Sequence, residues 1–108
     1  MLKGYNNKIP MFDPVNDTVL YRCLRYNLNN GSRRKRGTDL FARKDADNTI
    51  VYYFRHWDNS STGPATCQVT SKEEAVRFSR EQFTRPGFCT GGNHRGLSEF
   101  LPEVYSKA

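Results

Sequence analysis

The sequence lacks any long hydrophobic run, because no stretch approaches the ~20 apolar residues of a membrane-spanning helix. We therefore expect no membrane partner. It also lacks internal repeats, heptads and a linker between domains. Its 108 residues predict a single domain over 1–108. Within it, residues 1–10 are polar and are expected to form a poorly ordered lead-in.

Cysteine is scarce and odd in number: the chain has three, Cys23, Cys67 and Cys89. No secretory signal precedes them, and an odd count does not suit a disulfide framework. We therefore expect free thiols and a cytoplasmic, reducing location.

A metal-binding pattern is also missing. The residue types for a zinc site are present as Cys67, Cys89, His56 and His94. Structural zinc sites usually place their ligands in close pairs, and here only Cys89 and His94 form such a pair. The sequence thus predicts no metal ion, and it contains no phosphate-binding loop that would indicate a nucleotide cofactor.

No catalytic signature is present either. A small basic ribonuclease needs a general acid, a general base and cations for the phosphate. His56, His94 and Glu81 have suitable side chains, but no motif fixes their relative geometry. We expect a protein without enzyme activity and keep an endoribonuclease-type toxin as the third interpretation.

What the chain does have is positive charge: a formal net charge of +6 and a sequence pI near 9.5. Four consecutive cations, Arg33, Arg34, Lys35 and Arg36, lie between Gly31 and Gly37. Neighbouring like charges repel one another and glycines loosen the backbone, so residues 27–37 are expected to form an exposed basic loop. Such a loop favours a polyanion or an acidic protein surface as its partner.

Three further residues extend this candidate binding site. Arg55 lies in the aromatic run 52–57, where rings can stack on bases while the guanidinium meets a phosphate, although a buried core strand is the better explanation of the same rings. His94 and Arg95 lie in a second basic, glycine-containing loop, residues 87–97. The favoured function is a small, non-catalytic module that binds nucleic acid through phosphate contacts. The alternative is a protein-directed inhibitor or adaptor, for example a phage-like anti-defence protein that binds an acidic or nucleic-acid-binding surface.

Local patterns predict an α+β fold, with a three- to four-stranded antiparallel meander packed against one main helix and a short C-terminal helix. The strands are expected at 18–26, 39–44, 49–57 and 66–69, and the helices at 71–84 and 98–105. The segment 49–57 has the highest density of β-branched and aromatic residues, so we expect it in the centre of the sheet. Ser71 and Glu74 have the spacing of a helix N-terminal cap, and Ser98 is expected to cap the second helix.

Overall fold

A computed structural model describes residues 12–24, 33, 35–59, 65–83 and 91–106 of the chain. The elements are β1 (Thr18–Tyr21), β2 (Arg36–Lys44), β3 (Ile50–Asp58), β4 (Thr66–Thr70), α2 (Lys72–Phe83), α4 (His94–Phe100) and the 3-10 helix η1 (Pro102–Tyr105). The strands come first and the helices follow, which confirms the predicted α+β fold. The predicted lead-in, residues 1–10, lies outside the described residues.

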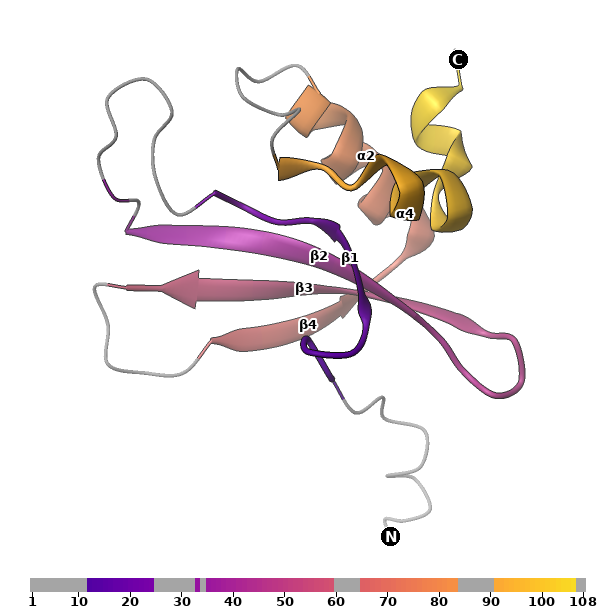
Figure 1. Ribbon diagram of the computed structural model, residues 1–108, viewed down its shortest axis with the longest axis horizontal. Coiled ribbons are helices and arrows are strands. Elements are labelled where there is room, and N and C mark those ends of the chain that lie inside the picture. The colour runs from indigo at the N-terminus through magenta and orange to yellow at the C-terminus, as the bar shows by residue number, and fades with distance from the viewer. Residues whose placement is uncertain (1–11, 25–32, 34, 60–64, 84–90, 107–108) are drawn as a thin grey trace, which may run out of the picture.

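The four strands form one antiparallel sheet in the order β1-β2-β3-β4, so each strand pairs with its neighbour in sequence (Figure 1). β3 lies between β2 and β4, and this confirms the prediction of a central strand at 49–57. All nine residues of β2 pair with β3, from Arg36 opposite Asp58 to Lys44 opposite Ile50. The meander predicted from the sequence is therefore confirmed.

One face of the sheet carries the larger core cluster, which packs against α2, α4 and η1. Leu40 and Ala42 of β2 point to this face together with Tyr52 of β3, because residues alternate across a strand. The Tyr52 hydroxyl donates to the carbonyl of Phe100 at 2.8 Å, so the last turn of α4 is fixed to the sheet.

The predicted inner face of α2 is confirmed at the positions that the structure describes. Ala75 and Ser79 are fully buried and Val76 is partly buried, whereas Arg77, Arg80 and Glu81 are exposed. The backbone N–H of Glu74 donates to Ser71 Oγ at 3.1 Å, as expected for the N-terminal cap. The Glu74 carboxylate pairs with Arg77. The side chain of Phe83, which we expected on the inner face, lies outside the described part of the chain.

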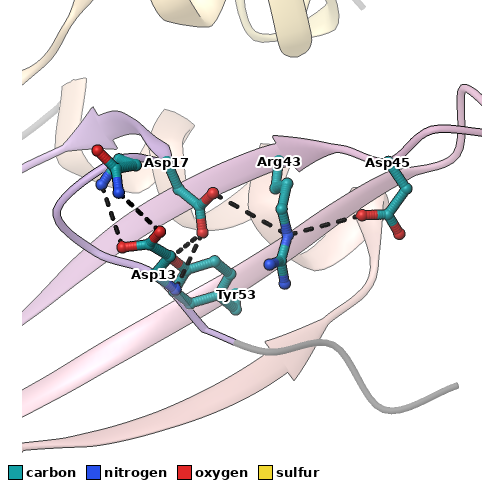
Figure 2. Close-up of polar contacts among 6 residues, drawn as sticks. Asp13, Asp17, Arg43, Asp45 and Tyr53 are labelled. Carbon is teal, nitrogen blue, oxygen red and sulfur yellow. Dashed lines mark hydrogen bonds and ion pairs between the residues drawn. The ribbon is translucent and has the colours of Figure 1, made fainter. Parts of the chain in front are cut away.

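The opposite face of the sheet is covered by the segment that leads into β1. Phe41 and Tyr53 stack with ring centroids 5.2 Å apart, and Phe12 lies 4.8 Å from Tyr53. Figure 2 shows how Asp17 is held there: it accepts from the Tyr53 hydroxyl at 2.6 Å and lies 4.0 Å from Arg43 Nε. β3 therefore has apolar contacts on both faces, as the sequence predicted.

Three predicted boundaries are wrong. β1 ends at Tyr21 and not at residue 26, because the next two backbone N–H groups leave the ladder: Arg22 N donates to the Gly91 carbonyl and Cys23 N donates to Asp39 Oδ1. β2 begins at Arg36 and not at residue 39, because Trp57 packs directly over Gly37; a Cβ on Gly37 would come within 2.3 Å of that ring.

The third error concerns the C-terminal helix. α4 begins at His94 and is capped by Asn93, whose side chain accepts from Gly96 N. Ser98 lies inside α4, and Pro102 begins the separate 3-10 helix η1, so residues 98–105 do not form one helix. No helix among the described residues is long and apolar enough to cross a membrane.

Candidate nucleic-acid interface

The basic run lies at the start of β2. Arg36 is the first residue of that strand and is exposed, as are Lys35 and Arg33 before it. The N–H of Asn59 donates to the Lys35 carbonyl at 2.6 Å, which extends the β2–β3 pairing by one bond. The prediction of a loop over residues 27–37 is therefore wrong at its C-terminal end, because Arg36 and Gly37 are strand residues; residues 27–32 lie outside the described residues. Arg34 lies outside the described residues.

A fourth cation, Arg22, lies at the same end of the sheet. The next residue, Cys23, donates its backbone N–H to Asp39 Oδ1 at 2.7 Å. The Cys23 sulfur lies over Gly37, since a Cβ there would come within 2.7 Å of Sγ. These two contacts of Cys23 bring its neighbour Arg22 close to the start of β2, where Arg22 is exposed. The sequence reasoning missed it, although antiparallel pairing of the first two strands would have brought the end of one to the start of the other.

We call the four exposed cations Arg22, Arg33, Lys35 and Arg36 the basic end. Four other cations are in ion pairs: Arg43 with Asp17 and Asp45, Arg55 with Asp39, Lys72 with Glu103, and Arg77 with Glu74. Within the part of the chain that the structure describes, none of the four side chains of the basic end is in an ion pair. Their charge is available to an external partner.

A polar strip of the sheet adjoins the basic end. Thr38 and His56 are cross-strand neighbours on the helix-bearing face, and Thr38 Oγ1 lies within hydrogen-bond distance of His56 Nδ1 at 2.9 Å. Thr66, opposite His56, and Gln68 are exposed, so the helices leave this part of the face uncovered. The His56 ring lies 6.0 Å from that of Phe54. Hydroxyl, amide and imidazole groups therefore line the surface beside the cations.

Arg55 does not join this strip. It points to the opposite face of the sheet, where Nη1 lies 3.5 Å from Asp39 Oδ2. Its side chain is 29% exposed and that of Asp39 is fully buried. This cation compensates a buried carboxylate, so its principal contact is within the fold.

His94 and Arg95 lie elsewhere. Both are in the first turn of α4, which contacts β1 and lies well apart from the start of β2 (Figure 1). His94 Nδ1 lies 2.7 Å from the Tyr105 hydroxyl, and Arg95 is exposed. The structure thus divides the described site residues among three places: Arg33, Lys35 and Arg36 at the start of β2, Arg55 on the opposite face, and His94 with Arg95 on α4.

The described residues that were considered for metal binding or catalysis, Cys67, His56, His94 and Glu81, are also dispersed, and Cys89 lies outside the described residues. Among the described residues no group of three or more His, Cys, Asp or Glu side chains is arranged to hold a metal ion. Cys23 and Cys67 are free thiols, and burial raises the pKa of Cys67. His56 and His94 belong to different elements and have different hydroxyl partners, and Glu81 is exposed on α2.

A groove of about 590 Å³ runs along α2 beside η1. Three cations line it, but each already has a partner. Lys72 Nζ lies 2.7 Å from Glu103, Arg77 pairs with Glu74, and Arg80 donates to the carbonyls of Glu103 and Ser106. The basic end is the stronger candidate for an anionic ligand. Compared with protein-family models, curated proteins and solved structures, the chain matches none.

Proposed function

We propose that the protein is a small, non-catalytic module that binds nucleic acid through contacts between the basic end and phosphate oxygens. The observation that carries the proposal is that four exposed cations lie at one end of the sheet and have no ion pair with any residue that the structure describes. Three of the four are arginines, whose planar fork matches two phosphate oxygens at once. Release of the counterions condensed on the nucleic acid supplies the driving force.

The polar strip beside the basic end could make further contacts with the same nucleic acid. Thr38, Thr66 and Gln68 present hydrogen-bonding groups, and the half-buried His56 ring presents an edge. These groups suit sugar and base edges, while the cations suit phosphates. Phosphate contacts carry no sequence information, so we expect binding that varies little among sequences.

The test compares two charge-matched triple variants. In the first, Arg33, Lys35 and Arg36 are changed to Gln, which lowers the formal net charge from +6 to +3. Binding of fluorescent oligonucleotides is titrated at several salt concentrations. We expect uniformly weaker binding, and a plot of log affinity against log salt that is flatter by up to about 0.9 for each duplex phosphate that the variant no longer neutralises.

In the control variant, Lys44, Lys72 and Arg77 are changed to Gln, which gives the same net charge at other places on the surface. We expect this variant to keep most of the parent's affinity and salt dependence. Arg22→Gln alone should weaken binding in the same manner as one residue of the first triple. Equal losses in the two triples would mean that net charge alone drives binding, and the proposal would be wrong.

A protein partner gives a different result. If the parent binds no oligonucleotide at physiological salt but binds another protein, the partner of the basic end is an acidic surface of that protein. The first triple should then mainly slow association, because charges at the rim of an interface steer the encounter more than they hold the complex.

A further inference from the structure

The two edges of the sheet differ in how they are closed. Along β1, the loop before α4 satisfies the outward-facing backbone. Asn93 N donates to the Leu20 carbonyl at 2.9 Å, Arg22 N donates to the Gly91 carbonyl at 2.8 Å, and Asn93 Nδ2 donates to the Val19 carbonyl at 2.7 Å. This edge has no room for another strand.

No segment among the described residues covers the β4 edge in this way. Within the described residues, the backbone of β4 is bonded only through its pairing with β3. In an antiparallel pair, alternate residues turn both N–H and C=O away from the partner, so this edge presents unpaired donors and acceptors. Thr66, Gln68 and Val69 are exposed, Val69 by 48%.

β4 also lacks the features that usually protect an edge. Its five residues, Thr66–Thr70, include no charge and no proline. Natural edge strands are commonly protected by lysine, proline or a bulge, or by a covering loop as β1 is. An uncharged, uncovered edge is a template for one more strand.

We propose that this strand is β4 of a second copy of the chain, paired antiparallel about a two-fold axis at Gln68. The side chains are self-complementary in this register. Thr66 faces Thr70 of the partner subunit, Cys67 faces Val69 of the partner subunit, and Gln68 faces Gln68 of the partner subunit. No charge opposes a like charge across the five residues. Directly opposite residues point to the same face, so both helical layers lie on one side of a continuous sheet.

The expected dimer is weak. Stable protein interfaces bury about 1,200–2,000 Å² in total, more than one five-residue strand pair provides. Two chains of formal charge +6 also repel each other over a Debye length of ~10 Å at 0.1 M salt. Added salt should therefore strengthen dimerisation, whereas it weakens phosphate binding. The inference does not depend on the proposed function.

The test is a charge exchange at Gln68. In Gln68→Lys two ammonium groups would face each other across the axis, and in Gln68→Glu two carboxylates would. Each variant alone should dimerise about fivefold more weakly than the parent, and an equimolar mixture should recover the association. Recovery in the mixture excludes misfolding as the cause. The same two changes at Ser98, exposed on α4, serve as the control and should leave association unchanged.

Sedimentation equilibrium under reducing conditions, up to about 1 mM protein, measures all of these species. The expected result is a parent dimer whose fraction rises with salt. A parent that stays monomeric at about 0.5 M salt, where repulsion is largely screened, overturns the proposal and leaves the edge to a strand of another protein. Variants that dimerise as well as the parent, or a mixture that does not recover, overturn it too.

Discussion

Asp39 and Arg55 face each other across the β2–β3 pair, and Arg55 Nη1 lies 3.5 Å from the fully buried Asp39 carboxylate. Asp39 Oδ1 also accepts from Cys23 N at 2.7 Å and from Trp57 Nε1 at 3.4 Å. This one carboxylate thus connects the residues after β1 with β2 and β3. It also holds the segment that carries Arg22 beside the start of β2, so the basic end depends on a buried acid.

The first prediction separates the ion pair from the other bonds of Asp39. Arg55→Met leaves a buried carboxylate without its cation and should cost about 1–3 kcal/mol of unfolding free energy. Asp39→Asn removes the charge but keeps an acceptor for Cys23 N. The double variant should lose less than the sum of the two single variants, by about 1–2 kcal/mol. Urea unfolding of the four proteins measures this coupling, and strictly additive losses would show that the two groups do not interact.

The second prediction concerns alkaline pH and the contact between Tyr53 and Asp17 (Figure 2). Burial, reinforced by the hydrogen bond to Asp17, raises the pKa of Tyr53 far above its usual value of 10.0. In the unfolded chain the phenol ionises near pH 10, whereas the folded protein keeps its proton. The stability that depends on this proton is complete below pH 10 and is lost as the pH rises above it.

Tyr53→Phe removes both the hydrogen bond and the titrating group. Below pH 10 this variant should be less stable than the parent by about 1 kcal/mol. Above pH 10 the free energy of unfolding of the parent should fall more steeply than that of Tyr53→Phe, by about 1.4 kcal/mol per pH unit for the one proton concerned. Urea unfolding from pH 8 to 11 should therefore show the difference in unfolding free energy between the two proteins closing above pH 10 and reversing by about pH 11. A constant gap would mean that Tyr53 ionises alike in the folded and unfolded chains.

Local sequence patterns predicted the elements that are stabilised by residues close to one another in the sequence. The dense β-forming run of β3 identified the inner strand, and Ser71 identified the start of α2, since its partner, Glu74 N, is three residues away. The start of β2 was missed because it depends on Trp57 packing over Gly37, a contact that no local pattern encodes.

The composition of the candidate site was only partly predictable for the same reason. The basic run is visible as consecutive letters, so Arg33, Lys35 and Arg36 were found. Arg22 joins them through the pairing of two strands, and Arg55 leaves them through an ion pair on the opposite face. Strand register and the face of the sheet decide which cations share a surface. The order of basic residues along the chain does not reveal either of them.

The third prediction concerns Asn93, which joins the C-terminal helix to the edge strand. Its Oδ1 accepts from Gly96 N at 3.2 Å and caps α4, while its Nδ2 donates to the Val19 carbonyl at 2.7 Å. Asn93→Ala removes the cap, worth about 1 kcal/mol, and leaves a partly buried carbonyl without its donor. We expect a total loss of about 1–3 kcal/mol in urea unfolding.

Two further variants divide this loss into its parts. Asn93→Asp keeps an oxygen for the cap but has no N–H for the Val19 carbonyl. Its free energy of unfolding should therefore lie between that of the parent and that of Asn93→Ala. Ser98→Ala, at the cap predicted from the sequence, should change stability by no more than about 0.5 kcal/mol, because Ser98 is exposed within α4. A Ser98→Ala loss as large as that of Asn93→Ala would place the helix start where the sequence pattern predicted it and contradict the bond between Asn93 and β1.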